Sequence, residues 1–578
     1  MSRATGSIAA EGTAAHRAWV VSPRWMLTWR HLLVCALASG LFVYLNYLPS
    51  LDSRIWLDAR RGREILAEQA IPAIDPVQPL SDGMRVIDTS WLSKVVCGWV
   101  EQWGGAPYLA HLFALATLAY VLILARVLFL QTRRLSLMMA GVGLVLVLGP
   151  RLQSLAAPDL FGAICFALLF ALVRRPADEG LGPLLAQPAG RARFPAGAWP
   201  VWLGTALLFV AWANLHASFL LGIVVLGCCA VGQAATAVAK TGSVRAALSD
   251  RQTQRWVLLA EWAAVASLVN PYGWNVALET CNLVRNENLR RMQDWLPLNL
   301  STPTGVLLLA SLLAVAAVLR SSRRQVRVAE ALLLTVFVAM LAPSARGLIW
   351  YAPVYALVIM PHVADVASRR PAVKDAAGRW FAGRKLLGRS FAGSAASAAG
   401  NAKAGWSTRG MATTLLCGLT VWCALAFSPI SQDVLGGKKL QSGRTLRSPV
   451  PAGVVEYLRR ETASKLVFAP VPWANCLVGQ CPPHVKVFMT SDVQWIPLRV
   501  WNDYGRITRS EPGWDQVLDR YHVDTVVVWK QHQRRLGDAL RASEKWQVVL
   551  EDDKSLVARR SAYHSRKHEP SDQGSEEG

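Results

Sequence analysis

Long apolar segments recur through the first three quarters of this 578-residue chain, and they constrain its fold more than any other feature. A helix of about 20 apolar residues crosses the ~30 Å hydrocarbon layer of a bilayer, and tilt or local thinning accommodates shorter ones. The segments lie at 31–48, 106–130, 135–149, 158–173, 199–214, 218–238, 256–270, 304–319, 328–342, 347–363 and 411–428. We therefore predict an α-helical polytopic membrane protein with about eleven transmembrane helices.

Basic residues between these segments predict the orientation of the helices. With the N-terminus in the cytoplasm, the cytoplasmic segments contain 27 Lys and Arg residues and the outer loops contain 11. Lys and Arg concentrate in cytoplasmic loops, so this alternation favours an inside N-terminus. We interpret the net charge of +23 as a topology signal and predict no nucleic-acid partner. An odd number of helices then places the C-terminus on the outer side.

The polar parts of the chain predict its domain organisation. We expect a cytoplasmic N-terminal segment at 1–30 and a transmembrane domain at 31–428, which includes an outer loop at 49–105 and a basic cytoplasmic linker at 365–410. A linker at 429–453 and a disordered tail at 561–578 flank residues 454–560, which alternate helix-like and strand-like patterns. We predict a small extracytoplasmic α/β domain there. Its expected strands are 465–469, 485–489, 525–529, 546–550 and 555–558, and its expected helices are 452–460, 514–521 and 534–542.

Polar side chains gather at the predicted outer helix ends, where they can meet in a cleft between protein, lipid and water. They include Asp58, Asp159, His216, Asn270 and Arg346. For any one of them, a solvated headgroup position or a helix-end hydrogen bond is the commoner explanation.

Cysteine spacing gives little evidence of a cofactor. No Cys/His spacing matches a structural zinc site, so we predict no cofactor, although a divalent metal is compatible with the sequence. Cys476 and Cys481 are equally consistent with a disulfide and with free buried thiols.

Several short motifs follow one another along almost the whole chain. The outer loop has Asp52 just past the first helix, then Trp56, Gly62, "IPAIDP" at 71–76 and "SWL" at 90–92. Later come "WANLHASFLLG", "NPYGW", "VPWANCLVG", "VKVFMTSD" and "LDRYHVDTVVV". In this order they resemble bacterial membrane glycosyltransferases of the GT-C superfamily, which are related to protein O-mannosyltransferases and lipid A aminoarabinose transferases. The similarity is greatest to uncharacterised bacterial members.

This resemblance implies an enzyme that moves a sugar from a polyprenyl-phosphate donor to a lipid, glycan or protein acceptor at the outer face of the bacterial cytoplasmic membrane. It also implies a catalytic carboxylate in the first outer loop, since an acceptor hydroxyl must lose its proton as it attacks the anomeric carbon. Asp52 is the best match by position. Asp58 is the alternative, because Arg54 and Asp58 stand where relatives carry an acidic residue and a histidine.

Cations are expected to balance the charge of the lipid phosphate, and other polar residues to contact the substrate. The cation candidates are Arg60, Arg61, Arg151 and Arg346, and the further contacts are Asp159, His216 and Asn270. Two other functions stay open: a transporter or flippase for a lipid-linked precursor, and a non-catalytic membrane scaffold of the same fold. A transporter predicts internal repeats, and none is evident.

Overall fold

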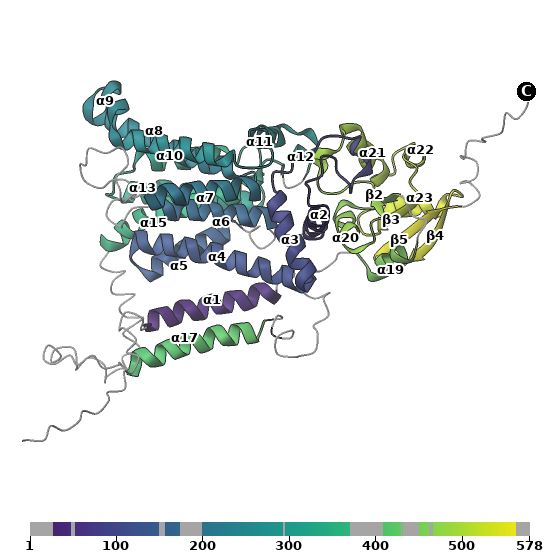
Figure 1. Cartoon of the computed structure of the whole chain (residues 1–578), viewed down its shortest axis with the longest axis horizontal. Helices are drawn as coiled ribbons and strands as arrows, with labels where there is room; N and C mark the ends of the chain where they lie inside the picture. Colours follow the sequence, from purple (N-terminus) through teal and green to yellow (C-terminus); the bar gives the residue numbers. More distant parts are fainter. Residues whose placement is uncertain are drawn as a thin grey trace, which may run out of the picture.

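A bundle of apolar helices forms most of the protein, and a smaller domain with a β-sheet lies at one end of it (Figure 1). The computed structural model describes residues 27–47, 53–149, 157–173, 199–292, 295–369, 408–428, 431, 450–461 and 466–561. The predicted site residues Asp52 and Arg151 lie outside this part of the chain.

The bundle is built from the segments that hydropathy identified. Each of the predicted segments coincides with a helix. These are α1 (Trp29–Tyr47), α4 (Ala106–Thr132), α5 (Leu135–Leu148), α6 (Ala157–Leu172), α7 (Trp199–Leu215), α8 (Phe219–Thr241), α10 (Arg251–Ser267), α13 (Pro303–Ser321), α14 (Val328–Ala339), α15 (Leu348–Arg369) and α17 (Thr408–Ala426). Among the described residues, five helices are long and apolar enough to cross a membrane by length and composition, those at 29–47, 106–132, 219–241, 303–321 and 345–369. The total number of spans remains a prediction.

Helix α15 is the centre of the bundle. Its residues from Leu348 to His362 are all buried, so its side chains contact protein on every side. Around it, aromatic rings interlock: Phe166 of α6 lies within 6.2 Å, centroid to centroid, of Trp212 and within 5.5 Å of Trp350. By contrast, α1 and α17 lie together at one edge of the bundle (Figure 1), and many of their apolar side chains are exposed. That exposure is expected of helices that face lipid.

Short helices connect the bundle to the smaller domain (Figure 1). They are α2 (Arg54–Glu68), η2 (Pro79–Ser81), α3 (Trp91–Gly104), α11 (Asn275–Arg285), α12 (Glu287–Arg290) and η6 (Ala345–Gly347), while α9 (Val244–Ser249) lies at the far end. Helices α2 and α3 cross at Gly62 and Gly98. A Cβ on Gly62 would stand 1.8 Å from the Lys94 carbonyl oxygen, so this crossing requires glycine.

The C-terminal domain contains a mixed five-stranded sheet in the order β2-β1-β3-β5-β4. Its elements are α19 (Ala452–Arg460), β1 (Leu466–Phe468), α20 (Val471–Gln480), β2 (Lys486–Val487), η8 (Val493–Trp495), α21 (Leu498–Thr508), α22 (Trp514–Arg520), β3 (Thr525–Trp529), α23 (Arg534–Ala542), β4 (Trp546–Glu551) and β5 (Ser555–Arg560). Strand β1 pairs in parallel with β2 and β3, whereas β5 is antiparallel to β3 and β4. The predicted strands are all present, but α20 and α21 were not expected. Cys476 and Cys481 are both buried, and no disulfide joins them.

The C-terminal domain is joined to the segment that carries α2 and α3. The Asn475 amide donates to the Ser53 hydroxyl at 3.0 Å, and the Thr490 N–H donates to the Gln78 side-chain oxygen at 2.9 Å. The close contact of Gly479 with Trp56 leaves no room for a Cβ, which would lie 2.7 Å from that side chain. The segment that carries α2 and α3 and the C-terminal domain are therefore packed together at one end of the bundle.

Candidate active site

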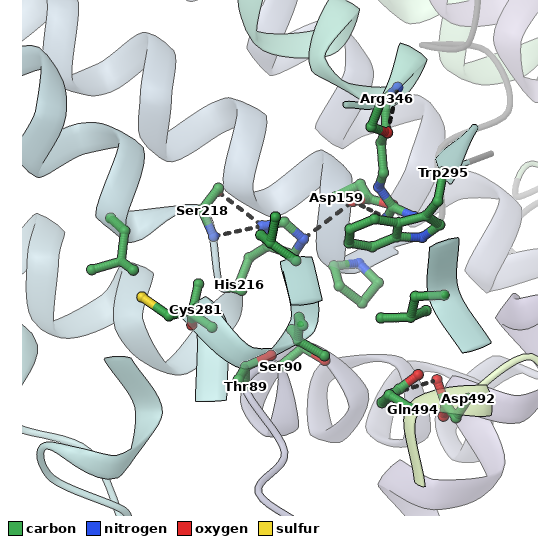
Figure 2. Close-up of a pocket in the computed structure, with 18 of the residues that line it drawn as sticks. Thr89, Ser90, Asp159, His216, Ser218, Cys281, Trp295, Arg346, Asp492 and Gln494 are labelled. Atoms are coloured by element: carbon green, nitrogen blue, oxygen red, sulfur yellow. Dashed lines mark hydrogen bonds and ion pairs between the residues drawn. The ribbon is translucent and has the colours of Figure 1, made fainter. Parts of the chain in front are cut away.

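A cavity of about 450 Å³ lies where the bundle, the α2–α3 segment and the C-terminal domain meet (Figure 2). Its walls come from the N-terminal ends of α6 and α8, from η6, from α11 and α12, from residues 87–94 and from residues 491–495. Its volume falls in the range of about 300–1,000 Å³ that small-molecule sites occupy. Apolar side chains such as Leu220, Leu221 and Val284 share the lining with charged ones, so the cavity suits an amphiphilic ligand.

Three residues predicted from the sequence meet in this cavity. The Arg346 Nη2 donates to both carboxylate oxygens of Asp159 at 2.5 Å, and the His216 Nε2 lies 3.1 Å from Asp159 Oδ1. Asp159 comes from the start of α6, His216 from the turn between α7 and α8, and Arg346 from η6 (Figure 2). The Arg346 guanidinium also lies 5.6 Å from the ring centroid of Trp295.

Hydrogen bonds around His216 fix its orientation. The backbone N–H of Ser218 donates to His216 Nδ1 at 3.1 Å, so Nδ1 acts as an acceptor. The proton of the ring then sits on Nε2, which faces Asp159. The hydroxyl of Ser218 lies 2.8 Å from Nδ1 and accepts from Trp212 Nε1 at 2.9 Å. Ser218, His216 and Asp159 thus form a chain of hydrogen bonds that holds the carboxylate in place beside Arg346.

A second cluster of charges joins the α2–α3 segment to the C-terminal domain. Arg61 donates to Asp492 at 2.5 Å and to Asp75 at 2.6 Å, and Lys94 donates to Asp88 at 2.7 Å. Both cations stack on Trp495, at 4.5 Å for Arg61 and 4.9 Å for Lys94. Such cation–π contacts strengthen where the cation is desolvated, as both of these are.

The ionisation of this second cluster follows from its geometry. Burial by itself lowers the pKa of the Lys94 ammonium, but the Asp88 and Asp492 carboxylates raise it above its ordinary value. Burial by itself raises the pKa of Asp492, but the Arg61 and Lys94 charges bring it below its ordinary value. Both groups are therefore charged at neutral pH, and the cluster carries fixed charges next to the cavity.

The other residues predicted from the sequence have different positions. Asp58 is buried, lies on α2 and lines the cavity together with Arg54. Arg61 lies beside the cavity in the ion cluster, whereas Arg60 donates to Glu64 at 2.8 Å and does not line the cavity. Asn270 does not line it either. Its amide donates to the Ser267 and Gly273 carbonyls, so it stabilises the turn after α10.

Sequence reasoning missed several residues of the cavity. Lys94 and Asp492 line it, as do Trp295, Trp495 and Arg290. A signal was present for two of them, because Lys94 follows the "SWL" motif and Asp492 ends "VKVFMTSD". Among the described residues, no group of three or more His, Cys, Asp or Glu side chains is arranged to hold a metal ion.

The overall arrangement matches a known structure. The sequence matches no protein-family model and no curated protein. An archaeal oligosaccharyltransferase from Archaeoglobus fulgidus, solved with an inhibitory peptide and a dolichol-phosphate, is similar with a TM-score of 0.50 and 11% identity over 94% of this chain and 75% of that one. The chain has a GT-C-like fold. At this identity the similarity establishes the fold of the GT-C glycosyltransferases and no more.

Two further solved GT-C structures are similar at lower scores. One is a mycobacterial arabinofuranosyltransferase, with 16% identity over 93% of this chain and 40% of that one and a TM-score of 0.46. The other is ArnT from Cupriavidus metallidurans bound to undecaprenyl phosphate, with 13% identity over 94% of this chain and 99% of that one and a TM-score of 0.42.

Proposed function

We propose that this GT-C-like protein is a membrane glycosyltransferase that takes a sugar from a polyprenyl-phosphate donor and transfers it to a hydroxyl acceptor. The observation that carries the proposal is the mixed lining of the cavity. Arg346 provides a positive charge for a phosphate, and the apolar residues of α8 and α11 suit the beginning of a prenyl chain. The dolichol-phosphate in the archaeal structure of the same fold is consistent with such a ligand.

Arg346 is the proposed phosphate-binding residue. Of the two terminal nitrogens of Arg346, Nη2 donates to the Asp159 carboxylate, and the ring of Trp295 lies against the guanidinium. A guanidinium has five N–H donors, so this pairing leaves donors available for phosphate oxygens. Asp159 and His216 are then positioning residues, which act on the substrate through Arg346. Arg290, an exposed residue of the cavity wall, is a second cation for the same phosphate.

Asp58 is the proposed catalytic base among the described residues. It lines the cavity, and a carboxylate there accepts the proton of the acceptor hydroxyl as the oxygen attacks the anomeric carbon. The bond from the anomeric carbon to the phosphate oxygen breaks in the same step, and the lipid phosphate leaves with the electron pair. Arg346 stabilises that charge, so no acid is needed for the leaving group.

The expected orientation in the membrane indicates the side on which the proposed reaction takes place. The distribution of Lys and Arg favours a cytoplasmic N-terminus. With this orientation, the cavity and the C-terminal domain lie on the outer side of a bacterial cytoplasmic membrane, where polyprenyl-linked sugars would meet their acceptors.

A transfer assay tests the proposal. Purified protein in lipid nanodiscs is incubated with radiolabelled undecaprenyl-phosphate sugars and a cell-envelope extract as acceptor. Asp58→Asn is expected to slow transfer by about 10²- to 10⁴-fold, the usual contribution of a general base. Glu68→Gln, an exposed residue of the same helix, is the matched control and should transfer normally. If wild-type protein transfers none of the sugars, the enzyme proposal is wrong. If Asp58→Asn equals wild type, only the role of Asp58 is wrong.

A further inference from the structure

The polar side chains that line the cavity differ in how far their hydrogen-bonding groups are already paired within the protein. Its charged side chains are largely engaged with one another, as in the pairs Arg346–Asp159 and Lys94–Asp88. Uncharged polar side chains gather on another wall, where Thr89 and Ser90 precede α3, and where Ser491 and Gln494 of the C-terminal domain flank the charged Asp492. In Figure 2, Thr89, Ser90 and Gln494 lie along the lower side of the view, across the cavity from Arg346.

Among the described residues, two side chains of this wall have few or no protein partners. The Ser491 side chain is buried, and within the part of the chain that the structure covers its hydroxyl has no hydrogen-bond partner. The half-buried Gln494 side chain donates from its Nε2 to Asp492 Oδ1 over a long distance of 3.4 Å. Native proteins rarely leave buried polar groups unsatisfied, because the loss of hydration is then uncompensated. Ser491 lines the cavity, and rotation about its Cα–Cβ bond would let its hydroxyl pair with a hydroxyl group of a ligand.

This wall is held in a fixed position. The backbone N–H of Ser491 donates to the Asn475 side chain at 3.0 Å. On the other side, Asn288 of α12 donates to the carbonyls of Val493 and Ile496 at 2.9 Å and 2.7 Å. The segment is thus fixed from both flanks by hydrogen bonds to its backbone. Its side chains are presented on a rigid support, which is what selective recognition needs.

We propose that Ser491 and Gln494 bind the glycosyl group of the donor, so that the C-terminal domain determines which sugar the protein accepts. The inference rests on the proposed function. A glycosyl group is joined to its phosphate by one oxygen, so a phosphate at Arg346 places the sugar within the same cavity of about 450 Å³. Ser and Gln side chains each donate and accept, and therefore match the dual character of sugar hydroxyls. Thr89 completes the wall from the α2–α3 segment.

Binding to two kinds of lipid tests this inference. The affinities of undecaprenyl phosphate and of a panel of undecaprenyl-phosphate monosaccharides (glucose, mannose, galactose and aminoarabinose) are measured for protein in nanodiscs. The readout is the ratio between the affinity of the best glycosylated lipid and that of the bare lipid phosphate. Ser491→Ala and Gln494→Asn are each expected to lower this ratio by about 5- to 10-fold, the effect of one lost hydrogen bond, without changing the affinity for the bare lipid. Ser543→Ala, elsewhere in the same domain, is the matched control.

The outcomes separate the two proposals. If no sugar in the panel improves binding over the bare lipid, or if the variant that combines Ser491→Ala with Gln494→Asn keeps the wild-type ratio, the role of the C-terminal domain is overturned while lipid-phosphate binding stands. If wild-type protein binds neither kind of lipid, the proposed function itself is wrong. Both substitutions remove few atoms, and the affinity for bare undecaprenyl phosphate reports on folding in the same experiment.

Discussion

The ion pair between Asp159 and Arg346 is the contact on which the candidate site most depends, and Asp159→Asn tests it. The two side chains are 7% and 21% exposed, so the pair is largely shielded from water. Removing one partner from a buried ion pair costs about 3–5 kcal/mol, because the other charge stays buried without compensation. Since water reaches a fifth of Arg346, we expect a loss near the lower end, about 3 kcal/mol.

The assay is equilibrium unfolding in mixed detergent micelles, followed by tryptophan fluorescence. Asp538→Asn removes the same kind of partner from Arg541 on the exposed face of α23, where the side chains are 63% and 38% exposed, and no measurable change is expected there. If Asp159→Asn lowers the free energy of unfolding no more than this control, the pair is not the buried contact described above.

A double variant separates stability from function. Replacing both partners by apolar residues of similar size, Asp159→Leu with Arg346→Met, is expected to recover most of the stability, because no unpaired charge then remains. The same variant should still bind undecaprenyl phosphate at least ~10-fold more weakly than wild type, since a charged hydrogen bond to the phosphate is gone. Wild-type affinity in the double variant would refute the assignment of Arg346 to the phosphate.

Three further predictions follow from single contacts. Gly162→Ala places a Cβ 2.7 Å from the side chains of His216 and Ser218, so thermal unfolding should occur at a lower temperature, whereas the Cβ of Gly143→Ala meets no atom within 4 Å and should not lower that temperature. Cys281 is an exposed thiol of the cavity wall, and undecaprenyl phosphate should slow its maleimide labelling several-fold; an unchanged labelling rate contradicts the proposed lipid site. Asp492→Asn should destabilise at neutral pH and not in acid, measured as unfolding free energy against pH. Burial alone raises the pKa of Asp492, but cations lower it overall, so its stabilising effect exists above the ordinary aspartate pKa and disappears as the pH falls through the lowered value.

Part of the candidate site was predictable from the sequence. Asp58, Asp159, His216 and Arg346 were expected at helix ends on one membrane face, because ionisable side chains avoid the hydrocarbon layer. They do line one cavity. Asn270 was expected there for the same reason, but its amide caps the turn after α10. The sequence pattern locates a residue along the membrane normal and gives no information on the direction of its side chain.

The contacts that the sequence did not predict join segments that are far apart in the chain. Arg61 looked like a phosphate ligand in the sequence, yet it pairs with Asp492, more than 400 positions away. Ser491 lies within the motif "VKVFMTSD" and Gln494 just after it, but the sequence did not indicate that either side chain faces a cavity. They matter because the α2–α3 segment and the C-terminal domain share one wall of the cavity.

The sequence by itself determined the apolar helices of the bundle and the strands of the sheet, because long apolar runs and the alternation of strands with period 2 are local patterns. Only the tertiary structure decided which charges pair and which polar groups stay available to a ligand. Ion pairs and hydrogen bonds act over a few ångströms, and the groups that make them here come from segments that the chain brings together only when it folds.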